Sequence, residues 1–294
     1  MKKAVILIIH TEINYCNMFI QQLIKDGTTD VFVHVNANVN ELKEKIIKSD
    51  CVHIVKNNVI IDWGSPGLMQ AIIESWKEVM NYGAFDYIIT CSGQDILLRE
   101  GLDDFLLNHP REIFIDAYED DKNRRVLLLN NWPKFYFRRI DCKFNPVRIM
   151  RRLRIEILKA GFSFGKRKIS YDVNKIVFYK NYFWSVIPAE VIQWILDYLK
   201  EYPEYWDVFN GAVPEEGFIA TTIMLSPYKE WIKYDNGISH SLTFIKPFYN
   251  NHPQLLLAED IKAAETSGLF FGRKIDPVKS FQFINYFYDK QADK

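Results

Sequence analysis

Two adjacent carboxylates, Glu215 and Glu216, follow Pro214 and directly precede an apolar segment that reads FIATTIML. A carboxylate at the edge of a buried segment could act as a general base, because apolar surroundings raise a carboxyl pKa toward neutrality. The pair could instead be acids in the first turn of a helix, where the helix dipole stabilises negative charge. On residue types alone the helix-turn interpretation is favoured over the catalytic one.

Adjacent cations stand at Arg273 and Lys274, in a segment FGRK that follows an aromatic run. Fixed cations of this kind could clamp a diphosphate, or they could form a solvated basic turn. The segment SGQD, which ends in Asp95, closes a very apolar strand. Its small residues would let a ligand approach closely, but a plain strand-to-helix turn with Asp95 as the turn residue is equally compatible.

A basic run, RRLR, occupies residues 151–154. An exposed helix face is the favoured interpretation. The functional alternatives are contact with an anionic membrane surface or with a phosphorylated lipid carrier.

Motifs for metal and phosphate chemistry are missing from the sequence. The histidines show no paired spacing of a metal site, and there is no Walker loop, GxGxxG or GxSxG motif. The acid-rich segment 116–121 lacks a plain DxD and is interpreted as a solvated loop. The four cysteines lie far apart and are expected to be free thiols in a reducing compartment. We therefore expect no metal site.

The elements that must position these residues alternate between strands and helices in the first part of the chain. Their order predicts a mostly parallel sheet with helices on both faces. The predicted strands are 4–9, 31–36, 51–55, 86–93 and 112–116, and the predicted helices are 17–27, 40–49, 65–83 and 102–109. Ligands bind at the carboxyl ends of such strands. The polar clusters 10–12, 34–36, 63–64 and 92–95 should therefore meet at one edge.

The second half of the chain is less regular. Helices are predicted over 188–202 and 217–225, strands over 231–235 and 241–248, and a helical tail follows them. Residues 120–170 are basic and aromatic without a clean period, so we interpret them as a region inserted into one domain that spans residues 1–294.

Composition limits the function classes. The chain has 294 residues, of which 48% are hydrophobic and 15% aromatic, so it can bury a sizeable core. It has 37 basic and 37 acidic residues, a balance that disfavours a nucleic-acid-binding protein. The apolar run 4–9 is too short for a signal peptide, and no stretch approaches a membrane span. We expect a cytoplasmic protein, with a possible place at the inner face of a membrane.

Seven segments in their order resemble the core-2/I-branching β-1,6-N-acetylglucosaminyltransferases, glycosyltransferase family 14, which also includes protein xylosyltransferases. The segments are VFVHVN, IIDWGSPGLMQA, DYIITCSGQDILL, NYFWSVIPAEVI, PEEGFIAT, HPQLLLAEDI and SGLFFGRKID. Each is modest alone, but their order and spacing are fairly specific, and the resemblance runs from about residue 4 to 277. The resemblance implies a GT-A-like α/β fold and inverting transfer from a UDP-sugar, without a metal ion or other cofactor. N-acetylglucosamine is the first donor sugar it implies, and xylose the second.

The resemblance also implies roles for individual residues. Glu216 matches the catalytic base of the family's P-[DE]-E-x-x-x-x-T pattern. Glu215 stands where an Asp is usual and is expected to hold the loop on the acceptor side. Lys274, with Arg273 beside it, matches the cation that neutralises the UDP diphosphate. Further donor contacts are implied for His34, Asn36, Trp63, Gly64 and Asp95. Trp231 and Tyr234 are candidates for stacking on a carbohydrate or lipid-linked glycan acceptor.

Three departures from the family pattern stand out. Asn36 occupies the position of an Asp that meets uracil, Ser65 follows Gly64 where a second Gly is usual, and Asn251 falls where the animal enzymes have a phosphate-binding arginine. His252 or Lys246 could substitute for that arginine. These departures keep a second interpretation open: a catalytically silent carbohydrate- or nucleotide-binding relative with the same fold. The basic region at 148–168 could contact a membrane or a lipid-linked acceptor.

Overall fold

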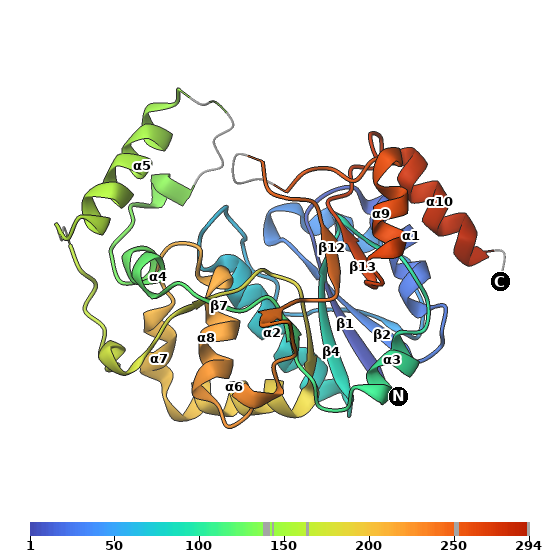
Figure 1. The fold of residues 1–294 in the computed structure, drawn as a ribbon, viewed down its shortest axis with the longest axis horizontal. Coiled ribbons are helices and arrows are strands. Elements are labelled where there is room, and N and C mark those ends of the chain that lie inside the picture. Colours follow the sequence, from blue (N-terminus) through green and yellow to red (C-terminus); the bar gives the residue numbers. More distant parts are fainter. Residues whose placement is uncertain (138–141, 143, 163–164, 250–252, 293–294) are drawn as a thin grey trace.

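The central sheet of the protein has six strands in the order β3-β2-β1-β4-β9-β6 (Figure 1). The computed structural model describes residues 1–137, 142, 144–162, 165–249 and 253–292. Strands β1 to β4 are mutually parallel, and β9 runs antiparallel between β4 and β6. The strands are β1 (Lys3–Ile9), β2 (Thr29–Val35), β3 (Val52–Ile54), β4 (Tyr87–Ser92), β6 (Phe114–Ile115) and β9 (Ser185–Pro188). The predicted α/β class with a mostly parallel sheet is confirmed.

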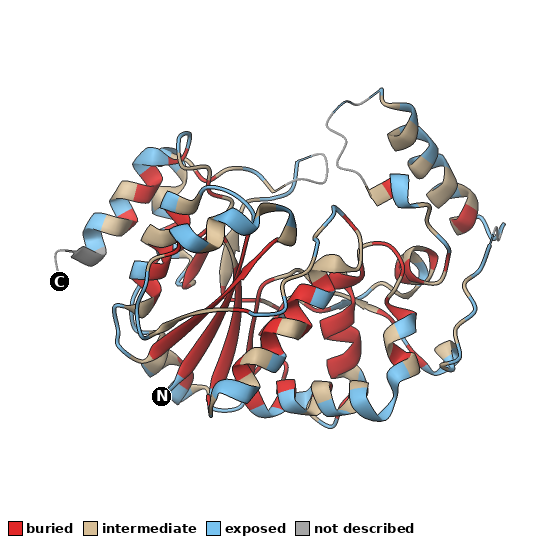
Figure 2. Cartoon of the chain, turned by 180° about the vertical axis from the view of Figure 1, so that it is seen from behind, coloured by how far each residue is buried: buried red, intermediate tan, exposed pale blue. Residues whose placement is uncertain are grey.

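Helices cover both faces of this sheet, which is why its strands are apolar throughout (Figures 1 and 2). All seven residues of β1 are buried, and successive side chains enter opposite cores. Ala4, Ile6 and Ile8 pack with α2 (Gly67–Tyr82), α6 (Ala189–Glu201) and α8 (Phe218–Leu225). Val5, Leu7 and Ile9 pack with α1 (Ile13–Ile24) and α3 (Leu102–Asn108).

A smaller three-stranded sheet ties the C-terminal part of the chain to the end of β4. It contains β12 (Thr243–Ile245), β13 (Phe271–Arg273) and β5 (Asp95–Leu97), with β13 antiparallel to β5. Helix α10 (Phe281–Ala292) packs Phe283 and Phe287 into the core beneath this sheet, and α9 (Ile261–Thr266) adds Ala264.

The remaining elements are short. Two hairpins pair β7 (Tyr118–Glu119) with β8 (Tyr179–Lys180) and β10 (Tyr234–Asp235) with β11 (Ile238–Ser239). The other α-helices are α4 (Asp121–Leu128), α5 (Pro146–Lys159) and α7 (Pro203–Val208). The 3-10 helices are η1 (Ala37–Lys45), η2 (Lys134–Phe137), η3 (Val173–Lys175), η4 (Pro214–Glu216), η5 (Lys229–Trp231) and η6 (Ala258–Asp260).

The predicted helix over 40–49 is wrong. The segment is the 3-10 helix η1, which is broken at Val39, and Ile46 is already extended. None of the residues of η1 is fully buried, and only Val39 and Leu42 pack partly against the core, so little apolar burial stabilises a regular α-helix there. The predicted strands over 112–116, 231–235 and 241–248 are shortened to Phe114–Ile115, Tyr234–Asp235 and Thr243–Ile245.

The region 120–170 divides into two parts. Helix α4 belongs to the body of the protein, because Leu128 at its end is fully buried in the core. Helix α5 packs on α4 but stands away from the sheet, and Leu158 is its one buried residue (Figures 1 and 2).

Gly211 is required where the loop before Glu216 crosses α4. A Cβ at this position would lie 2.4 Å from the Cα of Leu128, and Ala212 N donates to the Leu127 carbonyl at 2.9 Å. We expect Gly211→Ala to destabilise the protein by about 1–3 kcal/mol, because backbone would have to move. Urea unfolding measures this effect. Gly83→Ala is the control, since a Cβ at Gly83 meets nothing within 4 Å; equal stability of the two variants would contradict the prediction.

Candidate active site

The strand order reverses between β1 and β4, and the carboxyl ends of these strands mark the candidate site. Ligands of doubly wound sheets bind outside the carboxyl ends of the strands at such a reversal. Here β1 ends at Ile9 and β4 at Ser92, and Gly93 N donates to the Ile8 carbonyl at 3.0 Å. A Cβ at Gly93 would lie 2.7 Å from Cys16 Sγ, so only glycine allows this turn to pass so close to α1.

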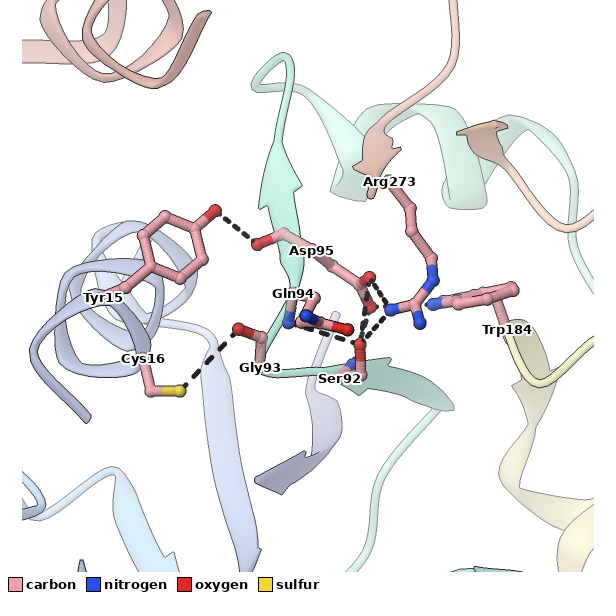
Figure 3. Close-up of polar contacts among 8 residues, drawn as sticks. All are labelled: Tyr15, Cys16, Ser92, Gly93, Gln94, Asp95, Trp184 and Arg273. Atoms are coloured by element: carbon pink, nitrogen blue, oxygen red, sulfur yellow. Dashed lines mark hydrogen bonds and ion pairs between the residues drawn. The ribbon is translucent and has the colours of Figure 1, made fainter. Parts of the chain in front are cut away.

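Asp95 is fully buried at this edge, and its carboxylate is bonded on both oxygens (Figure 3). Oδ2 accepts from Ser92 N at 2.6 Å and from Trp184 Nε1 at 2.8 Å. Oδ1 accepts from Arg273 Nη1 at 3.0 Å, and the Tyr15 hydroxyl donates to the Asp95 carbonyl at 2.8 Å. The Asp95 carboxylate therefore stabilises the turn at Ser92 and positions the side chain of Arg273.

Arg273, in β13, is the cation that lies against this turn. Its guanidinium lies 4.3 Å from the centre of the Trp184 ring, and Nη1 also donates to Ser92 Oγ at 2.5 Å (Figure 3). The register of β13 against β5 also pairs Arg273 with Asp95, so strand pairing and the side-chain contact both fix the position of Arg273. Lys274 follows directly and is partly exposed, and its carbonyl accepts from Leu256 N at 2.9 Å.

The loop that carries Glu215 and Glu216 is fastened by Asn181. This residue is fully buried, and its Nδ2 donates to the Glu215 carbonyl while its N donates to the Glu216 carbonyl, both at 2.9 Å. Asn181 Oδ1 accepts from Ala220 N at 3.1 Å in α8. One side chain thus ties the loop to the helix that follows it.

Glu216 lies between two cations. Its Oε2 is 3.5 Å from Arg124 Nη1 and 3.9 Å from Lys180 Nζ. The Arg124 side chain is 6% exposed and also pairs with Asp120 at 3.3 Å, whereas the Glu216 side chain is 36% exposed. The result is an oriented carboxylate that solvent or a substrate can reach.

Glu215 has the opposite environment. It is buried, and its Oε2 has no hydrogen-bond partner among the described residues. Burial, helped by the negative charge of Glu216, raises the pKa of Glu215 to about 8. Glu215 is therefore protonated at neutral pH, while its neighbour faces the cations Arg124 and Lys180.

Aromatic side chains lie beside Glu216 and form a group that we call the aromatic face: Tyr118, Tyr182 and Phe248. The rings of Tyr182 and Phe248 stack with centroids 5.1 Å apart and planes at 14°. Lys180 Nζ lies 5.1 Å from the Tyr182 ring and 5.7 Å from the Tyr118 ring, and it also approaches Glu216. Tyr118 and Phe248 are 43% and 40% exposed, so flat surfaces remain open to a ring-shaped ligand.

His34 and Asn36 support a neighbouring segment at the end of β2. His34 is fully buried, its Nε2 accepts from Val59 N at 3.2 Å, and burial lowers its pKa to about 4. Asn36 Nδ2 donates to the Ile61 carbonyl at 3.1 Å, and Oδ1 accepts from Ile61 N at 3.2 Å. Both amide atoms of Asn36 are thus engaged with the backbone of Ile61.

Trp63 and Gly64 link the site to neighbouring elements. Trp63 is 45% exposed, and the guanidinium of Arg151 in α5 lies 4.2 Å from its ring centre. Gly64 has a φ of 69°, which favours glycine, and its carbonyl accepts from Val213 N at 2.8 Å. Val213 immediately precedes Pro214, so this contact fixes the start of the Glu216 loop.

Trp231 lies at the other end of the sheet. Ile113 N, at the amino end of β6, donates to the Trp231 carbonyl at 2.7 Å. Trp231 and Tyr234 line a groove of about 420 Å³ with Arg111. Because β6 is parallel to β1, Trp231 lies at the amino ends of these strands, and the structure does not bring Trp231 together with Glu216.

Lys246 and His252 are the candidates to replace the phosphate-binding arginine whose position Asn251 occupies. Lys246 Nζ pairs with Asp260 Oδ2 at 2.8 Å, and Asn251 and His252 lie outside the described residues. Within the described part of the chain, no three His, Cys, Asp or Glu side chains gather as a metal site. No helix in that part is both long enough and apolar enough to span a membrane.

No protein-family model and no curated protein matches the chain. Solved structures similar to it include the galactosyltransferase LgtC in complex with donor and acceptor sugar analogues, with 9% identity and a TM-score of 0.36 over 98% of this chain and 95% of that one. A protein assigned as a glucose-1-phosphate thymidylyltransferase from Bacillus anthracis, in complex with sucrose, has 11% identity and a TM-score of 0.33 over 71% and 81%. HddC from Yersinia pseudotuberculosis, complexed with GMP-PN, has 12% identity and a TM-score of 0.31 over 66% and 79%.

Glu215→Gln tests the buried, protonated carboxyl through stability. Below about pH 4.5 the carboxyl binds a proton in both the folded and the unfolded chain. Between pH 4.5 and about 8 only the folded chain keeps it, so rising pH favours unfolding of the wild type. We expect the variant to gain at least about 1 kcal/mol relative to wild type between pH 5 and pH 8.5, measured by urea unfolding.

The control is Glu41→Gln, at an exposed carboxylate. Its stability relative to wild type should not change over the same pH interval. A pH-independent difference for Glu215→Gln would show that Glu215 is ionised in the folded protein.

Proposed function

We propose that this chain is an inverting glycosyltransferase that moves a sugar from a UDP-sugar to a carbohydrate hydroxyl without a metal ion. The observation that carries the proposal is Glu216: an exposed carboxylate, oriented by Arg124 and Lys180, on a loop fastened at the carboxyl edge of the sheet. In more general terms, we propose an enzyme that uses sugar nucleotides.

In the proposed reaction Glu216 is the general base. It accepts the proton of the acceptor hydroxyl while the hydroxyl oxygen attacks the anomeric carbon, and the bond from that carbon to UDP breaks. A single attack from the face opposite UDP inverts the configuration. UDP leaves with the electron pair of the broken bond, so compensating positive charge is required on the donor side.

Arg273 and Lys274 are proposed to supply that charge. Arg273 is held by Asp95 and by the Trp184 ring before any ligand arrives. Cations that are fixed in advance stabilise the departing diphosphate without reorganisation during the reaction. This role for the FGRK segment follows the resemblance to glycosyltransferase family 14, which also gives N-acetylglucosamine as the first donor sugar to test and xylose as the second.

The aromatic face is proposed to receive the acceptor. A carbohydrate ring that stacks on Tyr182 and Phe248 would lie next to Lys180, which approaches Glu216. Trp231 and Tyr234 are not part of this proposal, because Trp231 lies at the amino end of β6 and Tyr234 lines the same groove.

A catalytically silent binding protein is the second candidate. The resemblance assigns the position of Asn36 to recognition of uracil. Here both amide atoms of Asn36 are hydrogen-bonded to Ile61, and this engagement favours the silent candidate. A protein that only binds carbohydrate needs no base opposite a pair of cations. The two candidates therefore differ in whether Glu216 is required for turnover.

Glu216→Gln should abolish transfer while leaving UDP affinity within about twofold of wild type. The loss expected for a missing general base is about 10²–10⁴-fold in kcat. The measurement is UDP release from UDP-N-acetylglucosamine and UDP-xylose with a panel of oligosaccharides. Glu41→Gln serves as the control and should keep the wild-type rate. A Glu216→Gln enzyme that turns over at the wild-type rate would refute the assignment of the base.

Lys274→Ala should weaken UDP binding by about 1.5–3 kcal/mol, the scale of a charge-assisted hydrogen bond. Calorimetric titration in EDTA measures it, with Lys279→Ala on the following exposed turn as the control. Binding by the wild type in EDTA supports a metal-independent site. Binding that appears only after manganese is added would contradict metal independence, and no binding in either condition would favour the silent candidate or another donor.

A further inference from the structure

Helix α5 presents large apolar side chains to solvent. Ile149, Met150 and Leu153 are 53%, 45% and 59% exposed, and Phe144 and Phe162 beside the two ends of the helix are 85% and 64% exposed. We call these five residues the α5 outer face. Single exposed apolar residues are ordinary, but several on one helix and beside its ends indicate an interaction surface.

The opposite side of α5 is held against the protein, which fixes the direction of the outer face. Leu158 is buried, and Arg151 Nη1 donates to the Tyr136 carbonyl at 3.2 Å. Arg154 Nη2 donates to the Asn131 carbonyl at 2.7 Å. The spacing of Ile149, Met150 and Leu153 is that of one side of a helix, so these three side chains are directed away from the body together.

The charge of α5 selects the partner. The helix carries five cations and one carboxylate, whereas the whole chain has equal numbers of acidic and basic residues. Arg148 and Arg152 flank the exposed apolar side chains, and Arg152 is itself exposed. Apolar residues bordered by cations on one helix fit an anionic bilayer surface, where the apolar side chains enter the interface and the cations meet lipid phosphates. Two copies of this face would bring like charges together, which disfavours self-association.

We propose that α5, with Phe144 and Phe162, docks the protein on an anionic lipid bilayer. The inner side of α5 lies next to the candidate active site, because Arg151 contacts Trp63 and the Gly64 carbonyl bonds the loop of Glu216. An acceptor that is anchored in the bilayer would then reach the site from the membrane side. That consequence rests on the proposed function, but the docking itself does not.

The test is co-sedimentation with vesicles. Vesicles of phosphatidylcholine mixed with phosphatidylglycerol should bind the wild type at least about tenfold more tightly than vesicles of phosphatidylcholine alone, and salt should weaken the binding. Met150→Glu combined with Leu153→Glu should reduce binding at least about tenfold, because it removes apolar contact and adds negative charge. Arg148→Glu combined with Arg152→Glu should reduce binding to the mixed vesicles specifically.

The matched control places the same kind of change elsewhere: Val278→Glu combined with Phe281→Glu, at side chains that are 85% and 60% exposed. This variant should bind vesicles as the wild type does, and thermal unfolding should show that all variants are folded. No binding of the wild type to the mixed vesicles would overturn the proposal. Equal binding to both kinds of vesicle, or equal losses in the control and α5 variants, would also overturn it. UDP binding is measured separately, so failure here leaves the proposed function untouched.

Discussion

The buried carboxylate of Asp95 is the constraint on which the edge of the sheet depends. A fully buried charge must be paired and hydrogen-bonded, because its desolvation is otherwise too unfavourable. The partners that satisfy Asp95 come from three separate parts of the chain: the turn at Ser92, the indole of Trp184 and the guanidinium of Arg273. The Asp95 carboxylate therefore joins the main sheet to the smaller one and fixes the position of the Arg273 guanidinium.

A different interaction holds the Glu216 loop in place. Here the neutral side chain of Asn181 bonds the Glu215 carbonyl and the first turn of α8, while its backbone N donates to the Glu216 carbonyl. Neutral hydrogen bonds fix the backbone without neutralising the acid, so Glu216 takes its electrostatic partners from Arg124 and Lys180 instead. Asn181 therefore positions the loop, whereas Arg124 and Lys180 face the Glu216 carboxylate.

The sequence predicted what depends on local pattern. Strands such as β1 and β4 and the helix α2 were predicted closely because apolar spacing is strong there. The segment at η1 was mispredicted because its polar residues show no such spacing. Asn181, Lys180 and the aromatic face were missed, since their role arises only when distant segments meet, and an Asn or Tyr at a strand end carries no sequence signal. Trp231 and Tyr234 were named as stacking candidates for their ring chemistry alone, and ring chemistry does not reveal where a ring lies in the fold.

Neighbouring carboxylates with opposite environments are a recurring way to give two acids different tasks. Glu215 is deprived of solvent, and burial with the nearby charge of Glu216 raises its pKa to about 8. Glu216 keeps part of its surface open and faces two cations. If both acids were ionised in a buried loop, their repulsion would push the loop outward. Protonation of Glu215 removes that repulsion, so one acid of the pair can be buried beside a partly exposed neighbour.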